Sequence, residues 1–549
     1  MADDVSVNPS EPAVRRAAIA GIVATLAALG LSELVAGFLG GPSLLASVGG
    51  FVIDHQPAGA KDFVVSLFGD NDKLALEVLI VAVALAIGGA LGVLARRQHI
   101  IGSAGIGLFA AAGFVTALGD PSTSAAPAAI VAGVAAIAGM QTLGWLLAAT
   151  AARAGATAAT LPVDTRPAGA AVGATPVRVA GVTALRRSEG MPDWSRRGFL
   201  IKSGSLAVAS VVAGVVGRRL LEGTTGAPAT SGVTLPPPSQ AATLPSGAAL
   251  AVDGLTPIVV PNPGFYRIDT ALIVPNVQVA GWTLRIHGLV DRETRLTYAQ
   301  LAELPLVEQY VTIACVSNEV GGKLVGNAKW TGVRLREVLA MAGVQASASQ
   351  LVGRSVDGWT AGMPTAWVMD PSREPMIALA MNGEPLPRQH GFPARLIVPG
   401  LYGYVSATKW LAELQLTTIE GFDGYWVPLG WAKNGPILTQ ARIDVPRSGQ
   451  SVPAGRIAIA GVAWAPDRGI SKVEVGIDGT WHDCTLSMPI SKATWVQWTY
   501  AWDAAAAGPG RHTVEVRATD GTGVVQTADR TRPDPDGARG HHTIDVQVA

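Results

Sequence analysis

The residue whose type and setting most suggest chemistry is Cys315, in the stretch TIACVSNEVGG. The β-type residues 310–314 predict a strand that ends at this thiol, and the polar turn and Gly-Gly pair behind it predict a loop. Loops at strand ends often carry functional side chains. Two interpretations stay open from the position alone, because free cysteines are also common as small buried side chains.

The chain has one other cysteine, Cys484, far downstream in a region expected to be β-sheet. Two distant cysteines in 549 residues do not make a disulfide framework. We interpret Cys484 as structural, so any sulfur chemistry depends on Cys315.

The elements that would position this thiol belong to a chain with two dissimilar halves. Charged residues make up 15% of the sequence, and its mean hydropathy is +0.34. This balance is unusual for a soluble protein and indicates membrane segments. The 41 basic and 41 acidic residues cancel, and no basic patch interleaved with aromatics favours nucleic acid as a partner.

Region 1–220 is predicted to be a membrane region. Its apolar segments 17–40, 74–95, 100–118 and 125–152 each approach the roughly 20 residues that cross a bilayer as a helix. A fifth segment, 199–217, is richer in Gly, Ser and Ala. The loop 41–73 carries apolar patches and is expected to lie on the membrane surface or dip into it.

The basic residues predict the orientation of these helices. Arg15 and Arg16 precede the first segment, Arg96 and Arg97 follow the second, and seven arginines lie between the fourth and the fifth. The other loops are mainly acidic. The positive-inside rule then places the N-terminus in the cytoplasm and everything after about residue 220 outside the cell membrane.

The stretch SRRGFLIK (195–202) precedes the fifth segment and resembles a twin-arginine export signal. Arg196 and Arg197 fit that pattern, whereas Lys202 stands one position later than usual. The alternative is an ordinary basic flank of a membrane helix. An export signal of this type would allow a domain to cross the membrane already folded around a cofactor.

The remainder of the chain is predicted to hold a linker and two domains. Residues 221–254 are rich in Pro, Ala and Ser, as in a linker. Residues 255–428 mix strand and helix patterns, which indicates an α+β domain. Residues 429–549 contain short strands separated by Gly and Asp turns, which is typical of an immunoglobulin-like β-sandwich.

Several long motifs in residues 255–549 resemble the sulfite oxidase family of molybdenum enzymes. They are NPGFYRID (262–269), WTLRIHGLV (282–290), TIACVSNEVGGKLVGNAKWTGVRLREVL (312–339) and MNGEPLPRQHGFPARLIVPGLYGYVSATKW (381–410). The resemblance implies a molybdenum–molybdopterin cofactor, and no haem is expected. It also implies that Cys315 is the metal ligand, a role that suits a soft thiolate.

The same resemblance implies which residues bind the organic part of the cofactor. HGFPAR matches the family's phosphate-binding element, SATKW matches the loop after it, and the early loop closes over the pterin. The residues implied are Asn262, Tyr266, Arg267, Cys315, His390, Arg395, Ser406 and Lys409.

On the substrate side the sequence departs from the family. Cys315 and Asn318 lie in CVSNEV, where the family has arginines, and Trp431 stands near the position of a family tyrosine. Cys315, Asn318 and Trp431 are therefore the expected catalytic residues. The loss of positive charge weakens sulfite as the substrate and favours a neutral or bulkier one. Arg354, Arg373 and Arg442 remain alternative sources of charge in the pocket.

The function expected from these features is a membrane-anchored, extracytoplasmic molybdopterin oxidoreductase that transfers oxygen to or from a small sulfur substrate. Two alternatives stay open, a sulfoxide reductase and a cofactor-free binding module on the same fold. The expected partners are membrane lipid, an electron-transfer protein or quinone, and a second copy of the chain in a homodimer. The membrane half is either a simple anchor or a route for electrons to quinone.

Overall fold

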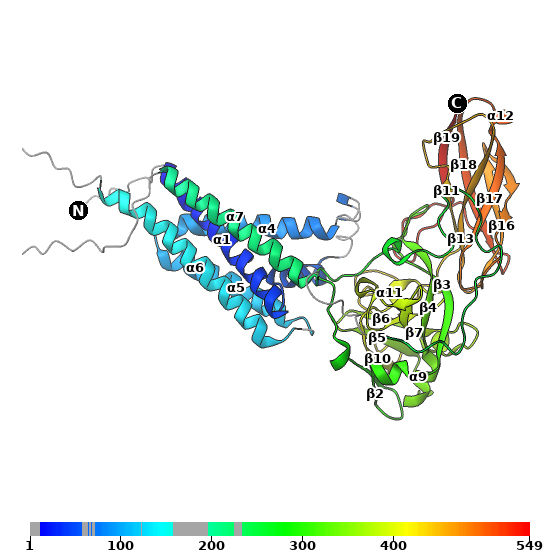
Figure 1. Cartoon of the computed structure of the whole chain (residues 1–549), viewed down its shortest axis with the longest axis horizontal. Helices are drawn as coiled ribbons and strands as arrows, with labels where there is room; N and C mark the ends of the chain where they lie inside the picture. Colours follow the sequence, from blue (N-terminus) through cyan, green and yellow to red (C-terminus); the bar gives the residue numbers. More distant parts are fainter. Residues whose placement is uncertain are drawn as a thin grey trace, which may run out of the picture. The chain divides into compact units, whose positions relative to one another are not determined.

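The computed structural model describes residues 11–57, 64, 67–68, 72–121, 123–156, 196–223 and 233–549. The chain divides into two compact units, one made of the helices before residue 226 and one that contains residues 226–549 (Figure 1). This division agrees with the change in composition that separates the two halves of the sequence.

Long apolar helices form the first unit. Among the described residues, five are long and apolar enough to cross a membrane, as the sequence predicts, and α2 is a shorter apolar helix. The elements are α1 (Glu11–Leu39), α2 (Leu44–Asp54), α4 (Asp72–Ala95), α5 (His99–Leu118), α6 (Ala125–Ala156) and α7 (Arg196–Leu221). The motif around Arg197 opens α7, while Ser195 lies outside the described residues, so the export signal stays a prediction.

Glycines allow the helices of this unit to approach one another closely. Helix α1 packs against α4, α6 and α7, and Figure 1 shows it running beside α7. A Cβ on Gly21 would collide with the carbonyl oxygen of Gly88 in α4, and one on Gly217 in α7 would collide with that of Glu33. Small residues at such crossings are typical of membrane helices, which associate through close backbone packing.

Glu33 is an acidic residue inside α1, and the structure gives it a local partner. Its side chain is buried, and Oε1 accepts a hydrogen bond of 2.5 Å from the Ser43 hydroxyl, which also caps the N-terminus of α2. On a neighbouring part of the unit, Arg218 of α7 forms an ion pair with Glu77 of α4. These pairings reduce the cost of placing charged groups among apolar helices.

Two sheets with short helices form the first part of the second unit. One sheet has the order β2-β1-β10-β5-β6, and the other has β3-β4-β7-β8 with β9 paired to β7. The strands are β1 (Thr283–Gly288), β2 (Thr294–Thr297), β3 (Leu306–Ala314), β4 (Val325–Arg334), β5 (Gln350–Ser355), β6 (Thr360–Pro364), β7 (Met376–Met381), β8 (Glu384–Pro385), β9 (Arg395–Ile397) and β10 (Leu411–Thr417). The helices are α8 (Tyr298–Ala302), α9 (Leu335–Ala342), α10 (Thr365–Met369) and α11 (Gly403–Ser406). This is the α+β domain that the sequence predicts.

Two sheets of mainly antiparallel strands form the predicted sandwich, which is coloured orange to red in Figure 1. Their orders are β11-β13-β17-β16 and β12-β19-β18-β14-β15. The bounds are β11 (Gln440–Val445), β12 (Ser451–Val452), β13 (Arg456–Trp464), β14 (Ile470–Ile477), β15 (Thr480–Asp483), β16 (Thr485–Leu486), β17 (Val496–Asp503), α12 (Ala504–Ala507), β18 (Gly510–Asp520) and β19 (His542–Val548). Burial alternates along β18, as it does in strands with one face toward a core.

The boundary between these two domains is bridged by a shared core. Trp464 and Trp495, which lie in the sandwich sequence, pack into the hydrophobic cluster of the α+β domain. The Trp495 indole donates to the Ile258 carbonyl at 2.9 Å. The two domains therefore form one packed unit, in which a change in one can alter the other.

The described part of the predicted linker, residues 233–254, is packed against this unit instead of forming a free tether. Gln240 makes a parallel bridge with Val307 at the edge of β3, and the Ser239 N–H donates to the Leu306 carbonyl at 2.7 Å. Ala248 is fully buried. An exposed strand edge presents unpaired backbone groups, and this segment satisfies some of them.

Candidate active site

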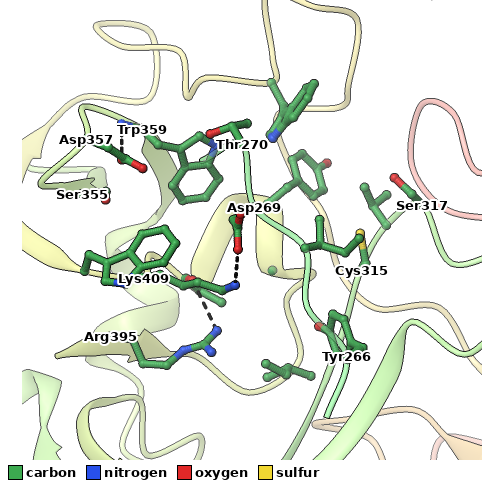
Figure 2. A pocket seen from close by; sticks show the side chains of 18 of the residues that line it. Tyr266, Asp269, Thr270, Cys315, Ser317, Ser355, Asp357, Trp359, Arg395 and Lys409 are labelled. Atoms are coloured by element: carbon green, nitrogen blue, oxygen red, sulfur yellow. Dashed lines mark hydrogen bonds and ion pairs between the residues drawn. The ribbon is translucent and has the colours of Figure 1, made fainter. Parts of the chain in front are cut away.

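A cleft in the α+β domain gathers the polar side chains that carry chemistry. Its empty volume is about 860 Å³, part of which is open solvent. The lining comes from the loop before β1, the end of β3, the β5–β6 hairpin and the segment around α11 (Figure 2). In the view of Figure 2, Cys315 and Ser317 lie on one side of the cleft, and Arg395 and Lys409 lie on another.

Cys315 is the first residue beyond the last pair of the β3–β4 ladder, in which Ala314 faces Val325. Its N–H donates to the Leu324 carbonyl at 2.9 Å, and its carbonyl accepts from the Asn318 N–H at 3.1 Å. The Asn318 Oδ1 accepts in turn from the Leu324 N–H at 2.7 Å. This tight loop holds a largely buried thiol, 8% exposed, at the wall of the cleft.

The sandwich domain braces this loop from outside. Arg442 of β11 donates to the Gly322 carbonyl at 2.9 Å and to the Thr256 hydroxyl at 2.8 Å, and its Nε donates to Asp444 at 2.6 Å. Gly321 has a φ of +78°, and a Cβ there would overlap the His542 ring of β19. The position of the thiol therefore depends on residues more than a hundred positions away.

Arg395 is a buried cation at the opposite end of the cleft. It is 3% exposed, and its Nη1 and Nη2 donate to the His390 and Ala407 carbonyls at 3.0 and 3.5 Å. Within the described residues no carboxylate pairs with it and its Nε has no partner. Burial lowers the pKa of Arg395 to about 10. A buried guanidinium without an acidic partner is costly unless a further anion binds it.

His390 lies beside this arginine in a fixed orientation. Its Nε2 donates to the Asn262 carbonyl at 3.0 Å, while its buried Nδ1 has no partner in the described part of the chain. Burial lowers the pKa of His390 to about 4, so the ring is neutral at pH 7. Asn262 is held by hydrogen bonds to Glu384 and Asn382, which makes it a support for His390.

Lys409 is the second cation of the cleft. Its Nζ lies 3.0 Å from Asp269 Oδ2 and 3.1 Å from the Gln389 carbonyl. Burial lowers the pKa of Lys409 to about 8, against the opposing effect of Asp269. Arg267 pairs with the same aspartate at 2.9 Å, but its side chain is 36% exposed and does not line the cleft.

Aromatic rings form much of the remaining wall. Tyr404 and Trp431 lie with ring centroids 6.0 Å apart, and the Tyr404 hydroxyl donates to the Ala432 carbonyl at 2.5 Å. The backbone N–H of Trp431 donates to the Trp426 carbonyl at 3.2 Å, so the two tryptophans lie on one turn. Burial raises the pKa of Tyr266, and the Cys315 thiol raises it further, so this phenol stays protonated.

The predicted site residues divide into those that line the cleft and those that support it. Tyr266, Cys315, Arg395, Lys409 and Trp431 line it. The lining does not include Asn262, Arg267, Asn318, His390 or Ser406. Among these, Asn318 closes the cysteine loop, and the Ser406 hydroxyl donates back to the Tyr402 carbonyl at 2.9 Å within α11.

Sequence reasoning missed several lining residues. They are chiefly Asp269, Ser317, Ser355, Asp357, Trp359, Tyr404, Trp410 and Trp426. One signal was available, since the Asp357–Gly358 turn in SVDGWT predicts the tip of a hairpin, where ligand contacts often occur. The others follow strands or turns whose facing is not apparent from their spacing.

The three arginines considered as alternative pocket charges are engaged elsewhere. Arg354 lies 3.5 Å from Glu413, Arg373 pairs with Asp370 and Asp467, and Arg442 pairs with Asp444. None of them lines the cleft.

The donor set of the cleft suits an anionic, metal-bearing organic group. A thiol at one end offers a soft ligand, and an uncompensated guanidinium at the other suits a phosphate. In the described part of the chain, no three His, Cys, Asp or Glu side chains gather as a metal site. The residues present fit a molybdopterin, whose metal Cys315 would hold and whose phosphate Arg395 would bind.

Comparisons with known proteins agree with this geometry. Residues 271–426 match the family model for the oxidoreductase molybdopterin binding domain, and residues 440–516 match the bacterial Ig domain. The chain is 31% identical over 270 residues to the mitochondrial sulfite oxidase of Homo sapiens, covering 42% of this chain and 49% of that protein. It is 29% identical over 288 residues to the NADH nitrate reductase of Hordeum vulgare, covering 42% and 31%.

The chain thus spans about half the length, or less, of these curated relatives. Among solved structures, the sulfane dehydrogenase SoxCD from Paracoccus pantotrophus matches with 23% identity and a TM-score of 0.47. That match covers 54% of this chain and 82% of the other.

Proposed function

We propose that this chain is a membrane-anchored oxidoreductase of the sulfite oxidase type that acts on a small sulfur substrate outside the cytoplasm, because residues 271–426 match the molybdopterin binding domain and the chain resembles a curated sulfite oxidase. In the oxidative direction, substrate and water give the oxygenated product, two protons and two electrons. In the reductive direction, the oxygenated compound, two protons and two electrons give the reduced compound and water. The observation that carries the proposal is that the Cys315 thiol and the buried, unpaired Arg395 guanidinium line one cleft.

Each residue of the cleft has a role in this proposal. When bound, the molybdenum–molybdopterin group supplies two-electron oxygen-atom transfer. Cys315 would hold the metal, while Arg395 and Lys409 would hold the anionic end of the pterin through charge-assisted hydrogen bonds. Tyr266 lines the same cleft as Cys315 and Arg395 and would contact the bound group. The aromatic wall would keep bulk water from the reacting atoms.

His390 and Asn318 act indirectly. His390 presents its carbonyl to Arg395 and so orients the guanidinium, and its own ring is oriented by the Asn262 carbonyl. Asn318 closes the loop that carries the thiol. We therefore assign positioning roles to both, whereas Cys315 would contact the metal and Trp431 the substrate.

The location outside the cytoplasm is supported by the arginines that flank the helices. Five apolar helices with basic loops on one side would place the catalytic unit on the other side of the cell membrane. Protease added to intact spheroplasts should then cleave the catalytic unit, whereas it should reach that unit only after lysis if the orientation is inverted. Lipid is the partner of the helices in this arrangement.

The two electrons require a second partner, which we propose to be an electron-transfer protein or a quinone. A homodimer through the sandwich domain is part of the same proposal. Sedimentation of the detergent-solubilised chain distinguishes a dimer from a monomer.

The decisive experiment compares wild type with Cys315→Ala and a control, Cys484→Ala, all expressed as the full chain in a host that makes the cofactor. Cys484 is partly buried, and burial raises its pKa to about 12, so it is an unreactive thiol. Wild type and Cys484→Ala should hold roughly one molybdenum per chain with a metal–thiolate absorption band. Cys315→Ala should lose this band and all activity.

The proposal fails if exported, folded wild-type protein carries no molybdenum. It also fails if Cys315→Ala keeps the wild-type absorption and turnover. The first result would favour a binding module on an inherited fold.

A further inference from the structure

The charge of the cleft limits what kind of substrate can enter it. Its lining contains two cationic side chains, Arg395 and Lys409, and two acidic ones, Asp269 and Asp357. Lys409 is paired with Asp269 at 3.0 Å, so it does not offer a full positive charge to another ligand. The formal charge of the lining is therefore zero, before any cofactor binds.

The proposed function assigns both cations of the lining to the cofactor. Arg395 lies at the end of the cleft away from Cys315 in Figure 2, where the proposed function assigns it to the anionic end of the pterin. The three other arginines considered for this pocket pair with Glu413, Asp370, Asp467 or Asp444 outside the lining. A doubly charged anion beside Cys315 would thus lack the compensation that a buried charge needs.

The wall of the cleft is correspondingly apolar and flat. Tyr404, Trp426 and Trp431 are each no more than 9% exposed and all line it. The hydroxyl of Tyr404 donates to the Ala432 carbonyl, the backbone N–H of Trp431 closes the turn onto Trp426, and the Tyr404 and Trp431 rings pack on one another. Val316, directly after the cysteine, adds another apolar contact. Rigid aromatic side chains of this kind stack against flat or aliphatic groups at low entropic cost.

Ser317 supplies a neutral hydrogen-bonding group close to the thiol. It is half-buried, lies two residues after Cys315 and lines the cleft. A hydroxyl can donate to the oxygen of an uncharged sulfoxide or accept from a polar hydrogen, and it adds no charge.

From these observations we propose that the substrate is an uncharged organic sulfur compound, a thioether or its sulfoxide, with an aromatic or bulky aliphatic substituent that packs on the Tyr404–Trp431 wall. The inference rests on the proposed function. Oxidation of the thioether takes the oxygen atom from water, releases two protons and passes two electrons to the proposed partner, either to a quinone or to an electron-transfer protein in two one-electron steps. Reduction of the sulfoxide consumes two protons and two electrons from the same partner and releases water.

The test uses the full-length holoenzyme in detergent, with molybdenum content measured on the same preparation. Tryptophan fluorescence is titrated with an aryl methyl sulfoxide, with dimethyl sulfoxide and with sulfite at two salt concentrations. Burial of the extra apolar area of the aryl group should make it bind roughly 10- to 100-fold more tightly than dimethyl sulfoxide. It should also bind more tightly than sulfite, with little dependence on salt.

Turnover gives a second readout on the same samples. Reduction of the aryl sulfoxide is followed with a reduced viologen dye as electron donor, and oxidation of the thioether or of sulfite with ferricyanide as acceptor. The expected order of kcat/KM places the aryl compound above sulfite in at least one direction.

Substitutions of Trp431 sharpen the assignment. Trp431→Leu should weaken the aryl sulfoxide about tenfold and leave dimethyl sulfoxide nearly unchanged, with Trp431→Phe in between. Trp431→Arg adds a cation to the wall and should raise the affinity for sulfite. Trp481→Leu removes an indole that packs against Arg517 in the sandwich and serves as the matched control, with no change in either ligand.

The inference is overturned if molybdenum-loaded wild type binds or oxidises sulfite better than every neutral sulfur compound tested. It is also overturned if folded Trp431→Leu and Trp431→Phe both keep the wild-type affinity for the aryl ligand. A preparation without molybdenum defeats the proposed function instead, so the two failures are distinguishable.

Discussion

The two ends of the cleft are built on different physical principles. The cation end consists of Arg395, His390 and Lys409, and within the described chain the buried Nε of Arg395 and Nδ1 of His390 have no hydrogen-bond partner. The thiol end consists of Cys315 in a loop whose backbone groups are paired, facing aromatic rings that pack on one another. The difference teaches that one end contains a buried cation with a polar atom left unsatisfied in the described chain, whereas the other end fixes the position of a thiol through backbone hydrogen bonds.

The ends also differ in where their support comes from. The guanidinium of Arg395 is held by the carbonyls of His390 and Ala407, both within twelve residues, and Lys409 by the Gln389 carbonyl and by Asp269, all in the α+β domain. The thiol loop is braced by Arg442 and His542 of the sandwich domain. Changes in the sandwich should therefore reach the thiol end first.

The largest expected effect comes from Arg395→Met, which separates ligand binding from stability. Loss of a buried, charge-assisted contact should weaken retention of the cofactor by roughly 10- to 100-fold. The apoprotein should be as stable as wild type or more stable by about 1–4 kcal/mol, because an uncompensated buried charge is removed. Molybdenum content and thermal unfolding of the apoprotein measure the two effects.

Arg354→Met is the control for this substitution, since Arg354 is 35% exposed and lies beside Glu413. It should leave the cofactor content unchanged. A destabilised Arg395→Met apoprotein with normal cofactor content would show that the two ends do not differ in the way described.

The next effect concerns Arg442→Met, which removes the brace of the thiol loop. It breaks hydrogen bonds to Gly322 and Thr256 and leaves the buried Asp444 without its cation, at a cost of about 3 kcal/mol. Hydrogen exchange across residues 315–324 should speed up, and activity should fall roughly tenfold as for other outer supports of a metal ligand.

Arg468→Met offers a matched comparison in the same domain, because Arg468 pairs with Asp467 and Asp520 without touching the cysteine loop. It should lower stability while leaving exchange at 315–324 at the wild-type rate. Equal exchange in the two variants would mean that the sandwich does not position the thiol.

A pH dependence is expected from one histidine at each end. Burial lowers the pKa of His390 and of His542 from 6.5 to about 4, and the Nδ1 of neutral His542 accepts from the Ile443 N–H at 3.0 Å. The unfolded chain binds these protons more readily than the folded chain. Stability is therefore complete above pH 6.5 and falls as the pH drops toward 4, by up to about 3 kcal/mol for each histidine.

The unfolding midpoint, followed by tryptophan fluorescence at several pH values, measures this loss. His542→Gln should make the dependence between pH 6.5 and 4 shallower, since one of the two groups no longer titrates. If the dependence of stability on pH has the same slope in His542→Gln as in wild type, the protonation of His542 does not contribute to the loss of stability.

The smallest effect is predicted for Asn318, which sequence reasoning placed among the catalytic residues. Among the described residues, the side chain of Asn318 makes one hydrogen bond, in which its Oδ1 accepts from the Leu324 N–H at 2.7 Å. Asn318→Asp keeps an acceptor oxygen and should retain activity within about threefold, whereas Asn318→Ala should lose about 1–2 kcal/mol of stability. A hundredfold loss of turnover in a stable Asn318→Asp variant would instead support a direct catalytic role.

Much of the architecture is apparent from local sequence. Apolar runs of membrane-spanning length predict α1, α4, α5, α6 and α7, since helix length and hydropathy are local properties. The β-type run before Cys315 likewise predicts the strand that ends there. The packing of the linker could not be predicted from local sequence, because the pairing of Gln240 with Val307 joins residues far apart in the chain.

The sequence by itself determined which chemical groups are available: one thiol at the end of a strand, a histidine and an arginine in HGFPAR, and a lysine in SATKW. Only the tertiary structure decided that Ser406 turns back onto α11, that Asp269 meets Lys409, and that Trp426 joins Trp431 and Tyr404 as a wall. The physical reason is that facing and burial depend on packing between distant segments. The sequence specifies the type of each side chain, whereas the fold determines which other side chains it contacts.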